Sequence, residues 1–274
     1  MRASLRSLHR SSLAGLSVLL VTAGGIAIAC SSSTSPDLSG TFFGTPTTMA
    51  TGSVRSYLVV GRDGTPTELG VAFTEAALVG LPAATTEFVV ALPAEASSTP
   101  YTHVGVNWQP TGHPPTTVYT VPHFDVHFYS ISLAERNTMT PADPQFATKL
   151  LRLPAGALVP AGYTADVMGI PRMGLHWGDP TSPEFSGQPF TRTFVYGSYD
   201  GKPIFAEPML AKSYLESKPV SDVKPIKVPA QYTTSGYQPT SYTVSFDAAT
   251  KEYHVALSGL VMRTAAPAFE QFAR

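Results

Sequence analysis

Residues 122–129, with the sequence PHFDVHFY, alternate side chains that can bind a metal ion with large apolar ones. A period of two residues predicts a β-strand, in which successive side chains point to opposite faces. His123, Asp125 and His127 would then share one face with Tyr129, while the intervening Phe and Val side chains belong in a core. Imidazoles and carboxylates on one face are the donors of a metal site of the zinc type.

Strand geometry limits which of these donors can bind the same ion. Residues i and i+2 lie roughly 6.7 Å apart along a strand, and residues i and i+4 roughly 13 Å. A straight strand therefore offers the pairs His123/Asp125 or Asp125/His127, and only a bulge or bend would bring His123 to His127. Because donors must converge within about 2.0–2.2 Å of the ion, others must come from elsewhere in the fold.

Two residues outside the strand are the expected partners. His176 lies in the glycine-containing segment MGLHW, which we expect to be a loop, and Glu207 lies in FAEPM, at an expected strand-to-helix junction. We predict a metal site, with Zn²⁺ or another divalent metal as cofactor, made of His123, Asp125, His127, His176 and Glu207. A metal ion with one open coordination position would bind and activate water, so hydrolysis or hydration would become possible. The sequence does not identify a reaction.

The same residues allow a second interpretation, a non-enzymatic binding or structural module without a metal. In that case the strand histidines make hydrogen bonds in a core, with Asp125 as their partner. Asp125 could also orient an imidazole without binding the ion. His113, in a turn ten residues before His123, is a further candidate that could fold back over the strand. His103 and His254 occur singly in strand patterns and are expected to be ordinary face residues.

The rest of the chain predicts a mainly β fold, a single antiparallel β-sandwich or barrel-like domain with two short helices. The 25 prolines and 22 glycines among 274 residues leave little room for long helices. Asp63-Gly64 and Asp200-Gly201 are favoured turn pairs between strand patterns and predict hairpins. The two helices are expected within residues 141–151 and 208–217, each with a proline at its start.

The N-terminal 29 residues have the pattern of a signal peptide, because Arg2, Arg6 and Arg10 precede an uncharged apolar segment that ends in small residues. Cys30, the only cysteine, stands where bacterial lipoproteins are cleaved and lipidated. The Ser-rich residues 30–48 would then tether a β-rich domain of residues 49–274. We expect an exported protein that its N-terminal lipid anchors to a membrane of the cell envelope, on the periplasmic or cell-surface side.

Charge and cysteine content exclude several classes of partner and site. Removal of the signal peptide takes three of the 18 basic residues and leaves an excess of the 19 acidic ones. There is no basic run interleaved with aromatic residues, so nucleic acid is not an expected partner. The lack of cysteine after Cys30 leaves His, Asp and Glu as the only ligands for a metal.

Several segments in a fixed order carry a resemblance to a known family. They are GVAFTEAAL at 70–78, VNWQP at 106–110, HFDVHFY at 123–129, MGLHW at 173–177, YGSYDG at 196–201 and FAEPM at 205–209. In these segments the chain resembles exported bacterial proteins that carry a domain of unknown function, one of which belongs to a sigma-E-type envelope regulon. The resemblance implies an exported β-rich domain capable of forming homo-oligomers, and no established reaction. Gln109 and Pro115 depart from the family pattern, where Asn and Glu are expected.

Overall fold

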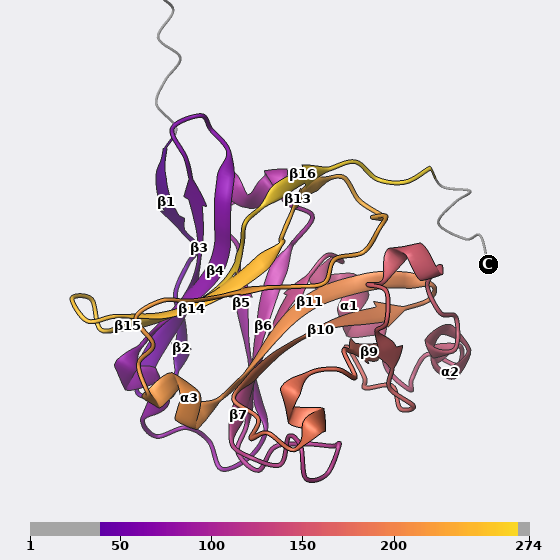
Figure 1. Cartoon of the computed structure of the whole chain (residues 1–274), viewed down its shortest axis with the longest axis horizontal. Coiled ribbons are helices and arrows are strands. Elements are labelled where there is room, and N and C mark those ends of the chain that lie inside the picture. The colour runs from indigo at the N-terminus through magenta and orange to yellow at the C-terminus, as the bar shows by residue number, and fades with distance from the viewer. Residues whose placement is uncertain (1–38, 268–274) are drawn as a thin grey trace, which may run out of the picture. The chain divides into compact units, whose positions relative to one another are not determined.

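The structure is a computed structural model that describes residues 39–267, which lie in one compact unit. The fold is mainly β, as predicted, and is built from antiparallel sheets (Figure 1). Among the described residues no sheet closes into a barrel, so the barrel-like alternative is wrong. No helix in this part of the chain is long and apolar enough to cross a membrane.

The first sheet has the strand order β1-β3-β4-β15-β14-β12, with β2 paired to β3. Its strands are β1 (Gly40–Phe43), β2 (Thr47–Met49), β3 (Gly52–Val60), β4 (Pro66–Thr74), β12 (Asp222–Pro225), β14 (Ser241–Asp247) and β15 (Glu252–Ser258). The hairpin predicted at Asp63-Gly64 is formed by β3 and β4. Residues 40–43 and 47–48, part of the predicted tether, belong instead to β1 and β2, because their backbone groups pair with β3. The predicted signal peptide and Cys30 lie outside the described residues.

The second sheet, which carries the predicted ligands, has the order β5-β6-β7-β11-β10-β9-β8. Its strands are β5 (Thr86–Ala91), β6 (His103–Gln109), β7 (His123–Tyr129), β8 (Thr164–Ala165), β9 (Leu175–Gly178), β10 (Arg192–Tyr199) and β11 (Lys202–Ala211). The hairpin predicted at Asp200-Gly201 joins β10 to β11. A separate two-stranded sheet pairs β13 (Gly236–Gln238) with β16 (Val261–Arg263).

The helical segments are short. They are α1 (Leu133–Thr138), α2 (Phe146–Leu150), α3 (Lys212–Glu216) and the 3₁₀ turns η1 (Glu75–Leu78), η2 (Ala94–Ser98), η3 (Gly156–Leu158) and η4 (Pro183–Ser186). The helix predicted within 141–151 is present as α2, but its predicted start at Pro141 is wrong, since the helix begins at Phe146, and α1 was not predicted. The helix predicted from Pro208 is wrong in its first turn, because residues 208–211 continue β11 and α3 begins only at Lys212.

The two large sheets pack against each other as a sandwich. The main hydrophobic core contains buried residues from both. Phe73 on β4 contacts Phe124 on β7, with ring centroids 6.0 Å apart, and Phe194 on β10 contacts Tyr242 on β14 at 5.5 Å. The predicted sandwich is therefore confirmed.

Strand β7 is buried on both faces, with β6 on one side and β11 on the other. Its Phe124, Val126 and Phe128 side chains lie in the core between the sheets, as the period-two pattern predicted. The opposite face is covered by smaller apolar clusters that include Tyr119 and Phe190. The polar residues of β7 are thus held in the interior, under loops of the same domain.

Candidate metal centre

The structure places His123, Asp125 and His127 on the same face of β7, each with no more than 2% of its surface exposed. The donors nevertheless belong to two groups, in each of which one ligand atom per residue lies within 4.8 Å of the others. The Asp125 group consists of His113, His123 and Asp125, and the Glu207 group of His127, His176 and Glu207. The division follows strand spacing, which keeps His123 away from His127.

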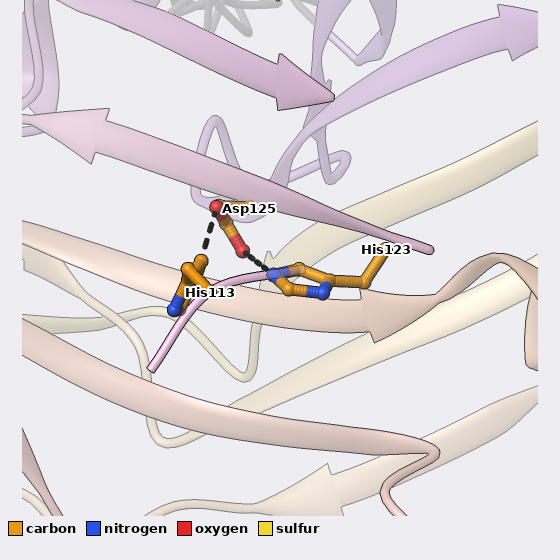
Figure 2. Close-up of side chains that lie close together, drawn as sticks. All are labelled: His113, His123 and Asp125. Atoms are coloured by element: carbon orange, nitrogen blue, oxygen red, sulfur yellow. Dashed lines mark ion pairs between the residues drawn. The ribbon is translucent and has the colours of Figure 1, made fainter. Parts of the chain in front are cut away.

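In the Asp125 group one carboxylate lies between two imidazoles (Figure 2). The His123 Nε2 atom is 3.1 Å from Asp125 Oδ1, and the His113 Nε2 atom is 3.5 Å from Asp125 Oδ2. The two rings lie nearly edge to face, with centroids 4.7 Å apart. His113 comes from the loop between β6 and β7, so this loop folds back over the strand.

Backbone carbonyl groups fix the tautomer of both histidines in this group. The His123 Nδ1 atom donates a hydrogen bond to the Val121 carbonyl at 2.8 Å, and His113 Nδ1 donates to the Pro114 carbonyl at 2.7 Å. A carbonyl oxygen only accepts, so the proton of each neutral ring is on Nδ1. In the neutral rings the Nε2 lone pairs face Asp125, in the arrangement that metal-binding histidines adopt. In the protonated rings Nε2–H donates to this carboxylate instead: burial acts to lower the pKa of His113, but the hydrogen bond and charge of Asp125 raise it.

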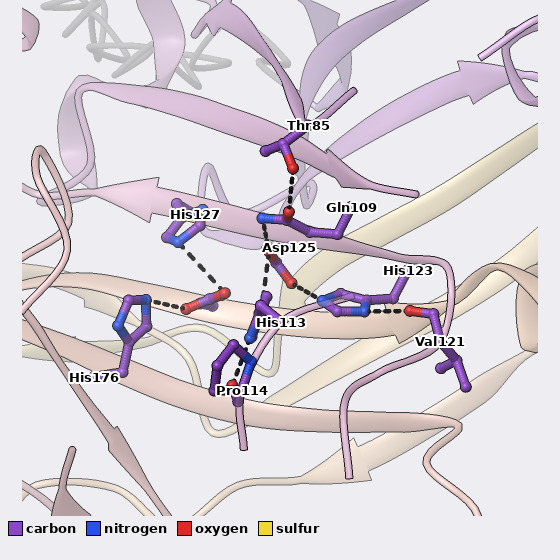
Figure 3. A network of polar contacts seen from close by, with 10 residues as sticks. Thr85, Gln109, His113, Pro114, Val121, His123, Asp125, His127 and His176 are labelled. Carbon is purple, nitrogen blue, oxygen red and sulfur yellow. Dashed lines mark hydrogen bonds and ion pairs between the residues drawn. The ribbon is translucent and has the colours of Figure 1, made fainter. Parts of the chain in front are cut away.

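The Asp125 carboxylate is itself oriented by neighbouring side chains. Gln109 Nε2 donates to Asp125 Oδ2 at 3.1 Å, and Gln109 Oε1 accepts from the Thr85 hydroxyl at 2.9 Å (Figure 3). Burial acts to raise the pKa of Asp125, but hydrogen bonds and charge from His113 and His123 outweigh it, so the pKa is lowered. Asp125 is thus a charged carboxylate held in the interior by polar partners.

The Glu207 group combines three strands of one sheet. His127 is on β7, Glu207 on the adjacent β11, and His176 on β9, beyond β10. The His127 Nε2 atom is 3.4 Å from Glu207 Oε1, and the His176 Nε2 atom is 3.6 Å from Glu207 Oε2. The pairing of β11 with β7 runs through Ala206 and resumes at Met209, which sets Glu207 opposite His127.

Gly197, on the strand between β9 and β11, leaves space for the Phe205 ring, which packs on the Glu207 group. Gly197 on β10 pairs with His176 on one side and Phe205 on the other. A Cβ atom at Gly197 would lie only 2.0 Å from the Phe205 ring. That ring packs against both histidines, with centroids 4.7 Å from His127 and 5.3 Å from His176. Close approach of this kind is a common reason for glycine inside a strand.

Burial keeps both histidines of the Glu207 group neutral. It lowers the pKa of His127 to about 3 and that of His176 to about 4. The same burial, together with the charge of Asp125, raises the pKa of Glu207 well above its ordinary value. Neutral imidazole is the form that binds a metal, and a nearby cation would favour the charged carboxylate.

Several donor atoms of the two groups have no hydrogen-bond partner among the described residues. They are His123 Nε2, Asp125 Oδ1, both ring nitrogens of His127 and Glu207 Oε2. Buried polar atoms are hydrogen-bonded in most proteins, so unpaired ones need an explanation. A bound cation would satisfy all of these atoms except His127 Nδ1, which carries the ring proton when Nε2 is the ligand.

In each group the two imidazoles approach different oxygens of the carboxylate, so the spacing can be compared with a metal site only pair by pair. A tetrahedral ion with bonds of about 2.0–2.2 Å holds its ligand atoms roughly 3.3–3.6 Å apart. The Glu207 separations of 3.4 and 3.6 Å fall in this range, as does the 3.5 Å between His113 and Asp125, while the 3.1 Å pair is slightly shorter. Two imidazoles and one carboxylate are a ligand set that suits zinc.

The five predicted residues fall in two groups and not in the single site expected, and two of their local settings are wrong. His176 lies in strand β9 and not in a loop, and Glu207 lies inside β11 and not at a strand-to-helix junction. His113, only a further candidate in the sequence, joins the site because its turn folds back over β7. Asp166 also lies nearby, because its backbone N–H donates to the His176 carbonyl at 2.8 Å. The sequence around Asp166 contains no signal for this position.

Comparison with known proteins gives a match over a limited part of the chain. A family model described as "TTHB210-like: Hypothetical protein TTHB210" matches residues 61–108. This segment runs from the turn before β4 to β6 and is similar to an uncharacterised domain family, but it ends before His113, the first ligand candidate. Comparisons with curated proteins and with solved structures returned no significant match.

Proposed function

We propose that this domain binds a divalent metal ion, Zn²⁺ by ligand type, at the Glu207 group. The observation that carries the proposal is the buried Glu207 carboxylate between the Nε2 atoms of His127 and His176, at 3.4 and 3.6 Å. Among the described residues, His127 Nε2 and Glu207 Oε2 have no hydrogen-bond partner. Such an arrangement is costly, because each unpaired buried polar group loses its hydration without replacement.

Three protein donors distinguish this site from a purely structural zinc site. Structural sites have four protein ligands, whereas catalytic sites have three and keep one position open. His176 is the most exposed of the three, with 19% of its side chain accessible, and thus lies on the solvent side of the site. The site is of the type that activates water, and the chemistry open to it is hydrolysis or hydration.

The proposal includes an envelope location. The N-terminal 29 residues and Cys30 have the pattern of a lipoprotein signal, so the β domain would be exported and held at a membrane by its lipid. Assembly into homo-oligomers is part of the proposal on the basis of the family resemblance. Cys30→Ser should move the full-length protein from the membrane fraction to the soluble fraction of cells, and an unchanged membrane fraction would contradict lipid anchoring.

Metal analysis of protein purified without chelator and without a histidine tag tests the proposed function. The wild type should contain at least one zinc ion per chain. Glu207→Gln keeps the shape of the side chain but removes its charge, and His176→Ala removes the most exposed ligand of this group, so both should lower the zinc content. His254→Ala is the matched control, because His254 lies on β15 in the other sheet and contacts Tyr57.

Two results would contradict the proposal. One is a folded wild type that contains no metal and takes up none from added Zn²⁺. The other is a zinc content that Glu207→Gln and His176→Ala leave unchanged while circular dichroism shows all variants to be folded. Either result would favour the non-enzymatic binding or structural module, in which the histidines serve packing alone.

A further inference from the structure

We infer that the Asp125 group is a second divalent-cation site, so that the domain holds two neighbouring metal ions. The inference rests on the proposed function, because it assigns a second ion beside the first. The two groups share no ligand, and each consists of one carboxylate and two imidazoles. The β7 strand supplies donors to both, since Asp125 and His127 are two residues apart on one face.

The strongest support is the set of hydrogen bonds that orient the three candidate ligands of the Asp125 group. Metal-binding histidines usually donate their second ring N–H to a carbonyl or carboxylate, and ligating carboxylates are themselves hydrogen-bonded. All three residues of the Asp125 group follow this rule, through Val121, Pro114 and Gln109. In the neutral rings it leaves each Nε2 lone pair available to a cation.

The Asp125 group has its own route for a cation. His113 is on a loop and exposes 33% of its side chain, whereas His123 and Asp125 expose 0% and 3%. Movement of this one loop residue would open the group without disturbing the sheet. His113→Ala therefore removes a ligand at the surface, and the variant should fold.

Loading of the chelator-treated protein with Co²⁺ tests the inference. Bound metal is measured by equilibrium dialysis followed by elemental analysis near pH 7.5, and the visible absorption of tetrahedral Co²⁺ reports the ligand field. Wild type should bind two ions per chain. His113→Ala and Asp125→Asn should each bind one, as should His176→Ala, whereas His113→Ala/His176→Ala should bind none and His254→Ala two.

The outcomes separate this inference from the proposed function. One ion in the wild type that His113→Ala and Asp125→Asn leave in place overturns the second site and retains the first. One ion that is lost in His113→Ala and also in His176→Ala means a single shared site and overturns the inference as well. Failure of wild type to bind any ion overturns both proposals.

Discussion

A histidine binds a metal through a ring nitrogen that carries no proton, and at His123 the backbone decides which nitrogen this is. Its Nδ1–H is held by the Val121 carbonyl two residues earlier in the chain. The turn that precedes β7 therefore prepares Nε2 as a donor before any ion arrives. Such preparation lowers the entropic cost of ordering the ligand on binding.

Gln109 offers a test at the residue scale, because its amide holds the Asp125 carboxylate in place. Gln109→Leu should weaken metal binding at the Asp125 group by about 10–100-fold, the usual effect of losing an outer-sphere hydrogen bond. The Glu207 group should keep its affinity. Competition of Co²⁺ loading with a chelator measures both affinities, and Gln145→Leu on the exposed start of α2 is the control. Equal weakening of both groups would contradict separate sites.

His103 gives a pH dependence that is separate from the ligands. Its ring stacks on Tyr129 at 4.8 Å, and burial, together with the charge of Arg136, lowers its pKa from 6.5 to about 4. Between these two values the unfolded chain binds more protons than the folded one, so the free energy of unfolding falls as the pH falls from 6.5 towards 4. His127 and His176, with lowered pKa values, act in the same direction.

Replacement of this histidine should make the metal-free protein less sensitive to acid. His103→Gln should reduce the slope of unfolding free energy against pH between pH 4 and 6.5, by at most about 1.4 kcal/mol per pH unit. Urea unfolding in EDTA at several pH values measures the slope for both proteins. The same slope in the variant and the wild type would show that His103 is not held neutral by the fold.

At the scale of the elements, a strand could be predicted from the sequence only where its alternation of polar and apolar residues was long enough. Strand β7 has seven residues in strict alternation, so its two faces could be predicted from the residue types. Strand β9 has only four residues and follows Gly174, which leaves too few positions for a period to be seen. Pro208 was predicted to be the first residue of a helix, because proline is common at that position. In the fold it lies in β11, at a point where the pairing of this strand with β7 is interrupted.

Gly197 links strand packing to the site and can be tested at this scale. Gly197→Ala would place a methyl group 2.0 Å from the Phe205 ring and must displace this ring, which contacts His127 and His176. Binding at the Glu207 group should therefore weaken by at least tenfold, while the Asp125 group remains intact. Gly156→Ala is the control, since nothing lies within 4 Å of a Cβ atom there. An unchanged Glu207 group in Gly197→Ala would show that Phe205 does not position these histidines.

At the scale of the whole molecule, the residue types of the site could be predicted, but their grouping could not. Grouping depends on the register of β11 against β7 and on the path of the loop that carries His113. Both are set by contacts between segments far apart in the chain, which a single sequence does not display. The prediction that a straight strand would separate His123 from His127 was correct, because it required only strand geometry.

Metal binding on the loop-covered face of the second sheet should stabilise the whole domain. A ligand that binds only the folded state adds about 2.7 kcal/mol at 100 times its dissociation constant. EDTA should therefore lower the melting temperature of the wild type by several degrees, and added Zn²⁺ should restore it. The His113→Ala/His176→Ala variant should melt at the same temperature with and without EDTA. A wild type that is insensitive to EDTA would contradict a structural effect of the metal.

The central claim, that buried imidazole and carboxylate groups on β7 and β11 hold metal ions, is tested most directly by anomalous diffraction. Crystals of the domain grown with Zn²⁺ would be measured on both sides of the zinc absorption edge. We predict one anomalous peak about 2.0–2.2 Å from donor atoms of His127, His176 and Glu207, and a second at the same distances from His113, His123 and Asp125. Crystals with no anomalous peak at either group would contradict the account.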